Sequence, residues 1–152
     1  RFRKPEKLKS QALEELTNSS IEHLPFRTWL SWQKKADALE KAHAEQTDEF
    51  VEKLNSLLSQ IDRPFGHRIN QAIHAYVANY PNLSIEANVQ CALADTLALR
   101  VLPKLRGIEL EDNRAHVLGQ IADLAIDHLA DEELAISIKQ GLGSQDVFHW
   151  TG

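Results

Sequence analysis

The stretch "IEANVQCALADTLALRVL", residues 85–102, decides the fold that we expect for this chain. Apolar or small side chains occupy almost every side of a helix drawn through it, which is typical of a helix that is buried all round. We therefore predict that it forms the central helix of a helical core, with Cys91 as a small buried residue. The helix is expected to end before Pro103, because a residue that precedes proline disfavours the α region.

Helical periodicity continues on both sides of this stretch, whereas the period-two alternation of β-strands is almost absent. Thr47 is expected to cap a helix that runs to about residue 61. Asp131 is expected to cap a short last helix, with Gly141 at its C′ position. Further helices are expected after Pro5, after Pro25, from His67, and over residues 114–130. The predicted fold class is all-α, a bundle of about six helices with room for a short strand at either end.

The pattern divides the chain into three parts, which we expect to pack as one domain because 152 residues can bury a sizeable core. Residues 1–46 form an N-terminal connecting and helical segment, whose last part is strongly polar. Residues 47–107 form the helical core, and residues 108–152 form a C-terminal helical extension. The extension ends in "LGSQDVFHWTG", which is apolar and aromatic and is expected to be a strand or a tail packed on the body.

Composition limits the setting and the partners of the chain. A single cysteine rules out an internal disulfide and favours a reducing, cytoplasmic location, and no apolar run is long enough to span a membrane. The net charge of -5 is unevenly spread: residues 1–46 carry nine Lys/Arg against seven Asp/Glu, whereas residues 107–152 carry two against nine. Such polarity can orient a domain against its neighbours, although solvated helix faces that merely differ would look the same. The pI of 5.8 and the lack of a basic stripe argue against direct nucleic-acid binding.

Sequence motifs for catalysis and metal binding are scarce. The chain has no G-x-x-x-x-G-K-[ST] phosphate loop, no H-E-x-x-H and no G-x-S-x-G. His67 and His74 stand about 10 Å apart along a helix, which is too far for one metal ion. Asp123 and Asp127 lie one helical turn apart and could share a cation, but a solvated acidic face is the favoured interpretation. The tryptophans are interpreted as packing residues rather than base-stacking platforms: Trp29, Trp32 and Trp150.

The stretch "RPFGHRINQAIHAY", residues 63–76, starts a helix in an unusual way. A helix N-terminus carries unpaired N–H groups and about half a positive charge, so it attracts anions. Gly66 would let a ligand approach the backbone closely. Arg68 places a full cation where the helix dipole disfavours one, although an arginine can fork two N–H groups onto a phosphate. A phosphate contact is one interpretation of Arg68; an ion pair with Asp62 or simple exposure to water is the other.

The segment Phe65-Gly66-His67-Arg68, followed by a helix with one apolar face, resembles the sensor-2 segment of AAA+ ATPases. The later stretch "ALADTLALRVLPKLRG", residues 92–107, is similar to the helix and tail in the lid of McrB-like AAA+ proteins from bacterial restriction and defence systems. The resemblance covers about residues 47–107. Residues 1–4 then resemble the last strand that leaves the ATPase core, and residues 108–152 a C-terminal extension.

The resemblance implies that this chain is the C-terminal helical lid of an AAA+ NTPase. Arg68 would contact the γ-phosphate of ATP or GTP bound with Mg²⁺, and Gly66 and His67 would line the approach. The partners implied are an AAA+ core domain of the same chain and further copies in a homo-oligomeric ring. Arg106 would face an adjacent subunit or the core, whereas Lys104 is favoured as a cation that complements the preceding helix dipole.

Departures from the family pattern limit what this piece can do. The phosphate loop, the acidic Mg²⁺-binding motif and an arginine finger are missing, so these residues alone are not expected to hydrolyse nucleotide. The sequence also lacks methionine, so we expect it to be a C-terminal piece of a longer protein. The alternative function is a non-enzymatic helical interaction module, with residues 26–46 and the aromatic tail as docking surfaces.

Overall fold

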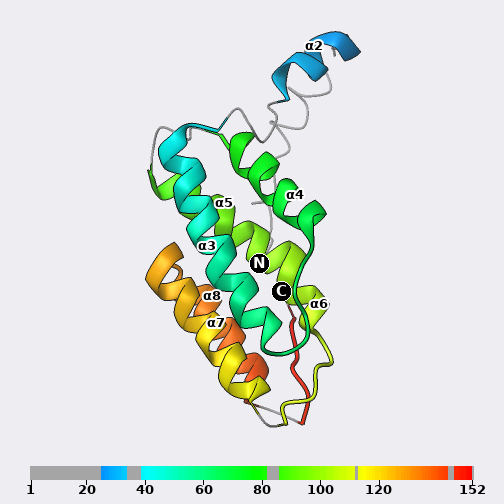
Figure 1. Ribbon diagram of the computed structural model, residues 1–152, viewed down its shortest axis with the longest axis vertical. Coiled ribbons are helices and arrows are strands. Elements are labelled where there is room, and N and C mark those ends of the chain that lie inside the picture. Colours follow the sequence, from blue (N-terminus) through cyan, green and yellow to red (C-terminus); the bar gives the residue numbers. More distant parts are fainter. Residues whose placement is uncertain (1–24, 34–38, 82–85, 112, 144–145, 152) are drawn as a thin grey trace, which may run out of the picture. The chain divides into compact units, whose positions relative to one another are not determined.

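The computed structural model describes residues 25–33, 39–81, 86–111, 113–143 and 146–151 (Figure 1). The chain divides into two compact units, residues 1–33 and 34–152, and each is described by itself. The named elements among the described residues are all helices, so the predicted all-α class is confirmed. The two divisions drawn from the sequence, at residues 47 and 108, both fall inside the second unit.

The first unit contributes one described helix, α2 (Phe26–Trp32). It begins directly after Pro25, as predicted, and the Pro25 carbonyl oxygen accepts a hydrogen bond from the Thr28 N–H at 2.9 Å. The helix ends where the backbone of Gln33 becomes extended. The helix predicted after Pro5 and the strand suggested for residues 1–4 lie outside the described residues.

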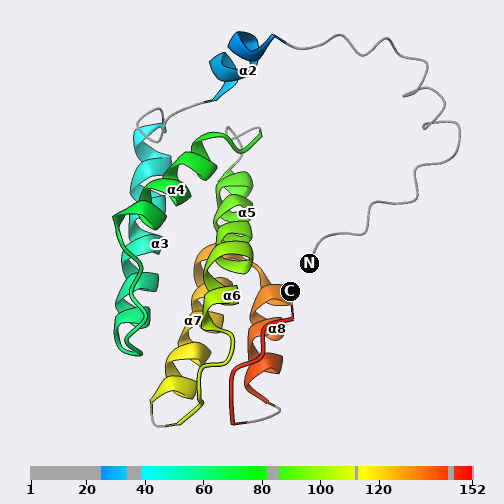
Figure 2. The same ribbon diagram turned by 90° about the vertical axis from the view of Figure 1, so that its right-hand side faces the viewer.

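The second unit is a bundle built around α5 (Glu86–Thr96), which packs against α3 (Lys41–Ser59), α4 (His67–Ala78) and α7 (Arg114–Leu129). The last helix, α8 (Glu132–Leu142), packs beside α7 (Figure 2). All these helices contribute fully buried side chains to one core. Helix α5, which the sequence predicted to be the central helix, lies at the centre of this core. The core includes Phe50, Ile73, Leu93, Leu118 and Ile138.

One side of α5 remains open, and the predicted burial of Cys91 is wrong. Cys91 is exposed, and Leu99, two turns further along, is 52% exposed. The neighbouring described helices therefore leave Cys91 and Leu99 open, whereas Tyr76 of α4 contacts Asp95 between them. An almost uniformly apolar helix does not reveal in its sequence which side its neighbours leave open.

Helix α3 starts earlier than expected, and the prediction that Thr47 caps it is wrong. Thr47 lies inside the helix, fully buried, and its hydroxyl donates a hydrogen bond to the His43 carbonyl oxygen at 2.7 Å. A threonine hydroxyl can be satisfied by the carbonyl one turn earlier, which allows the residue to be buried within a helix.

The central helix also runs past Pro103, contrary to the prediction. It continues through η2, a π-helical turn over Leu97–Val101, into α6 (Leu102–Leu105), and Leu102 is helical with φ -56° and ψ -38°. Proline inside an α-helix lacks one N–H and collides with the carbonyl four residues earlier. Here a π-helical turn, whose hydrogen-bond pattern differs from that of an α-helix, directly precedes the turn that contains Pro103. The chain therefore remains helical through the proline.

Helices α7 and α8 form an antiparallel hairpin that starts and turns as predicted. Ala130 adopts a left-handed conformation with φ 51°, and Asp131 then caps α8 by accepting a hydrogen bond from the Leu134 N–H at 2.9 Å. Glu132 and Glu133 occupy the first turn, where the helix dipole favours acidic side chains.

Replacing Asp131 by alanine should lower the free energy of unfolding by about 1 kcal/mol, because the Leu134 N–H loses its acceptor. Urea denaturation followed by circular dichroism would measure the change. Asp131→Asn is the matched control, since asparagine caps helices about as well as aspartate. Equal losses in the two variants would show that the cap is not the source of the stabilisation.

The C-terminal tail packs on the bundle, as one of the two sequence interpretations proposed. An isolated antiparallel bridge joins Glu109 and Val147. The Phe148 N–H donates to the Ile108 carbonyl oxygen at 2.7 Å, and the Gly107 N–H donates to the Phe148 carbonyl oxygen at 2.9 Å. Phe148 is fully buried and Trp150 is 8% exposed, so the tail belongs to the core and offers neither aromatic ring as a docking surface.

Gly141 lies inside α8 and not at its C′ position, so that prediction is wrong. The tail backbone crosses the helix here, and the His149 N–H donates to the Gly141 carbonyl oxygen at 3.1 Å. A Cβ atom at residue 141 would collide with the His149 carbonyl oxygen. The glycine is therefore needed for a close approach of two backbone segments.

Candidate anion-binding site

The connection between α3 and α4 is held by short-range hydrogen bonds. Asp62 takes a left-handed conformation with φ 57°, and the Arg63 N–H donates back to the Leu58 carbonyl oxygen at 2.9 Å. The Phe65 N–H donates to the Asn55 side-chain oxygen, also at 2.9 Å. These bonds fix the direction in which the chain enters α4.

Helix α4 begins at His67, as predicted, and has no side-chain cap. Gly66 is the N-cap residue, with an extended backbone (φ -86°, ψ 178°) and an exposed surface. The N–H groups of His67 and Arg68 make no hydrogen bond with another described residue, whereas that of Ile69 donates to the Gly66 carbonyl oxygen at 3.0 Å. Two donors therefore point out of the start of the helix.

The space around this helix start is open. No atom outside the immediate chain neighbours lies within 4 Å of the position that a Cβ on Gly66 would take. His67 and Arg68 are both exposed, and the ion pair between Arg68 and Asp62 that the sequence allowed is not formed. The structure thus leaves a helix N-terminus and one arginine accessible to a ligand.

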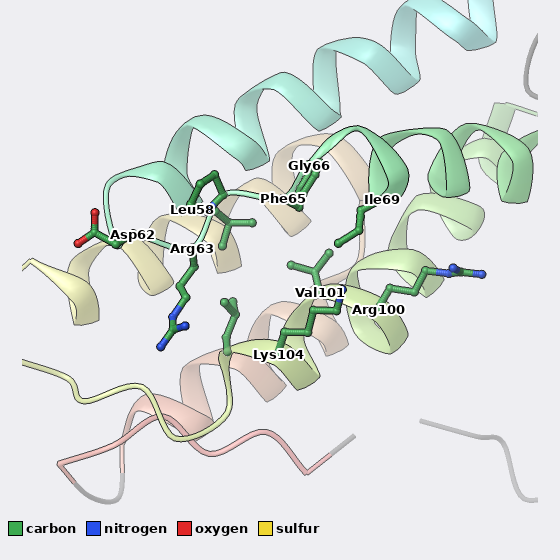
Figure 3. Close-up of a pocket in the computed structure, with 11 residues that line it drawn as sticks. Leu58, Asp62, Arg63, Phe65, Gly66, Ile69, Arg100, Val101 and Lys104 are labelled. Atoms are coloured by element: carbon green, nitrogen blue, oxygen red, sulfur yellow. The ribbon is translucent and has the colours of Figure 1, made fainter.

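A hollow of about 350 Å³ adjoins Gly66 on the side of η2 and α6. Leu58, Phe65, Ile69, Val101 and Leu105 give it an apolar lining. Three cations, Arg63, Arg100 and Lys104, and one carboxylate, Asp62, also line it. Figure 3 shows that the three cationic side chains do not converge, since Arg63 and Arg100 extend in different directions. We call this site the basic hollow.

A second hollow, of about 410 Å³, adjoins Gly66 on the side of α3. Its lining combines apolar surface with the polar residues Glu52, Ser56, His67 and Asn70. The side-chain oxygen of Asn70 is buried and has no hydrogen-bond partner. His67 therefore faces a different hollow from the three cations, with Gly66 at the border of both.

A comparison with protein-family models identifies the family of this chain. A family model described as "Domain of unknown function (DUF8727)" matches residues 11–140. The chain belongs to this family. No curated protein and no solved structure matches it. The DUF8727 match includes both hollows and stops before the buried tail.

Of the residues that the sequence of this DUF8727 chain suggested, Gly66 borders both hollows, His67 lines the second hollow and Arg68 lines neither. Sequence reasoning did not point to two cations of the basic hollow. Arg63 and Arg100 come from distant parts of the chain, and no motif joins them. Lys104 was interpreted as complementing a helix dipole, and the structure adds that it lines the hollow. Arg106, proposed for a subunit contact, is exposed beyond the end of α6 and lines neither hollow.

Arg100, one of the three cations that line the basic hollow in the DUF8727 fold, also lies against an aromatic ring. The Tyr76 hydroxyl donates to Asp95 at 3.0 Å, and the Arg100 guanidinium lies 5.9 Å from the centre of the Tyr76 ring. Burial, followed by the hydrogen bond to Asp95, raises the pKa of Tyr76 to about 12, so the hydroxyl stays protonated at neutral pH. Arg100 therefore has a cation–π contact but no carboxylate partner among the described residues.

His74 and Asp123, which the sequence suggested as candidate metal ligands in this DUF8727 chain, make other contacts. The described residues contain no group of three or more His, Cys, Asp or Glu side chains placed to hold a metal ion. His74 pairs with Asp48 at 2.9 Å, and Asp123 pairs with Lys139 at 2.8 Å. None of the described helices has the length and apolar character that crossing a membrane requires.

Proposed function

We propose that this chain is the helical lid of a McrB-like AAA+ NTPase, and that Arg68 contacts the phosphates of the bound nucleotide. The observation that carries the proposal is the uncapped, open start of α4, which presents two unpaired N–H groups and an unpaired Arg68. The nucleotide, ATP or GTP with Mg²⁺, would be held mainly by a core domain of the same protein. The protein would act as a homo-oligomeric ring.

The electrostatics of this region support an anionic ligand. The helix dipole adds about half a positive charge to the two free N–H groups, and an arginine can bind a phosphate through two parallel hydrogen bonds. Arg68 in the first turn costs stability of a few tenths of a kcal/mol for the helix alone. Arg68 lowers the stability of the helix and has no ion-pair partner among the described residues, which is consistent with a residue that binds a ligand.

The proposed mechanism is closure of the lid. Binding of the γ-phosphate would draw α4 toward the core domain, place Arg68 on the phosphoryl oxygens and exclude water from the reacting groups. Hydrolysis and loss of phosphate would release the lid. The lid would thereby report the state of the nucleotide to its neighbours in the ring.

Arg68→Ala in the full-length protein should reduce nucleotide hydrolysis at least tenfold, a loss of about 1.4 kcal/mol of transition-state stabilisation. Phosphate release under saturating nucleotide would measure the change. Lys41→Ala removes an exposed cation in a weak surface pair and is the matched control, for which we expect unchanged turnover. Wild-type turnover in Arg68→Ala would contradict the assignment.

The sequence of the full-length protein before Arg1 provides an independent check. A phosphate loop and an acidic strand motif within the ~200 residues of one preceding domain are expected. If the full-length protein contains neither, the lid assignment fails and an interaction module becomes the better description.

A further inference from the structure

The α7–α8 hairpin exposes two large apolar side chains on one face. Ile126 is 40% exposed and Ile136 is 54% exposed. The ion pair between Asp123 and Lys139 joins the two helices on their outer surface. Ile126 lies three residues after Asp123 and Ile136 three residues before Lys139, so both isoleucines lie about one turn nearer the hairpin bend on that same face.

Acidic side chains surround this apolar pair. Asp127 and Glu132 are exposed and make no ion pair with another described residue, and the carboxylate of Asp123 is matched only by Lys139. We call the surface formed by Asp123, Ile126, Asp127, Glu132 and Ile136 the hairpin face. It is an apolar centre whose border carries three carboxylates and one cation, Lys139, which pairs with Asp123.

The basic hollow has the opposite character. Its lining is largely apolar, and its three cations outnumber its one carboxylate, that of Asp62. Arg63 and Lys104 make no ion pair with another described residue. Its cationic groups are spread along the hollow rather than converging on one point, so they suit a broad surface better than a single small anion (Figure 3). The hollow and the hairpin face are therefore complementary in both charge and apolar character.

The two surfaces cannot meet within one molecule. Helices α4 and α7 each pack against α3 and α5. Figure 1 shows the hairpin and α4 on opposite sides of α3 and α5. A contact between the hairpin face and the hollow therefore needs a second copy of the chain.

We propose that the hairpin face of one copy docks onto the basic hollow of the next copy. Such a contact joins two different surfaces, so it is heterologous: each copy keeps one surface free, and association continues until a ring closes or a filament forms. Opposite charges at the edge align the two copies, and burial of Ile126 and Ile136 supplies the apolar contribution. The contact is formed by this chain alone and does not require nucleotide.

Sedimentation equilibrium of the 152-residue chain over a range of concentrations tests association. We expect the average mass to rise with concentration beyond that of a dimer, and to fall when salt is added, because salt screens exposed charges. A monomer mass at every concentration and at low salt would overturn the proposal.

Two double variants test which surfaces are used. Arg63→Glu with Lys104→Glu disables the hollow, and Ile126→Ser with Ile136→Ser disables the hairpin face. Each variant alone should remain monomeric, and thermal melting by circular dichroism should confirm that both remain folded. Lys41→Glu, which reverses an exposed charge on α3 outside both surfaces, should associate like the wild type.

Mixing the two double variants gives the deciding result. Each retains one intact surface, so an equimolar mixture should form a heterodimer and nothing larger. A mixture that stays monomeric would overturn the proposal. So would a hollow variant that associates like the wild type, because that behaviour indicates a symmetric contact between two hairpin faces.

Discussion

Replacing Phe148 by alanine is expected to lower the free energy of unfolding by about 3–5 kcal/mol, the usual cost of removing a buried phenylalanine. Phe148 is fully buried, and its backbone exchanges two hydrogen bonds with residues 107 and 108. Its ring therefore anchors the tail to the bundle. Denaturant unfolding of the 152-residue chain, followed by circular dichroism, measures the loss.

Val147→Ala is the matched control for Phe148. Val147 is the neighbouring tail residue, is only partly buried, and faces away from Phe148 because adjacent side chains of an extended segment alternate. We expect a loss of about 1 kcal/mol or less for this variant. If Phe148→Ala were no more destabilising than Val147→Ala, the tail would not be part of the core.

Gly141→Ala is the second substitution with a large expected effect. The added methyl group would meet the His149 carbonyl oxygen and press on the Phe148 ring, so either the tail must move or the helix must distort. Overpacking of this kind typically costs about 1–3 kcal/mol. Thermal melting should show a clear decrease in Tm.

Gly119→Ala provides a control with the opposite sign. Gly119 lies within α7, and no atom lies within 4 Å of the position of an added Cβ. Alanine there should stabilise the chain by about 0.5–1 kcal/mol, because it lowers the conformational entropy of the unfolded state. If both glycine variants shifted Tm in the same direction, the close approach at Gly141 would not be the cause.

Elements set by local chemistry could be predicted from the sequence. The start of α4 at His67 and the cap of α8 at Asp131 were predicted correctly, because the signals for a helix start lie within a few positions of one another. The region of α7 was also placed correctly by its helical periodicity.

Features that depend on distant neighbours could not be predicted. The burial of Cys91 was mispredicted because it depends on which side of its helix the other helices cover. Thr47 was predicted to cap α3, but the helix begins at Lys41 and Thr47 is buried inside it. Gly141 suits a helix end, but its environment is decided by a tail segment that crosses it. In each case a sound local preference was overridden by tertiary packing.

The candidate site was partly predictable for the same reason. Gly66 and Arg68 belong to one short segment, so their unusual combination is visible in the sequence. Arg63, Arg100 and Lys104 border one hollow only because the loop before α4 lies against the turn that precedes α6. The charge pattern along the sequence does not reveal that these residues lie close together in the fold.

The π-helical turn over Leu97–Val101 has a consequence for the register of everything that follows it. A π turn holds about one residue more than an α turn, and one residue corresponds to about 100° of rotation. Residues after Val101 are therefore turned by roughly that angle from where an unbroken α-helix would carry them. Leu105 reaches the core and Lys104 reaches the hollow from this rotated position. The loss of a single residue from this turn would restore an ordinary α turn and leave Leu105 and Lys104 facing as they do now, whereas the same loss from a regular α turn would rotate both by about 100°.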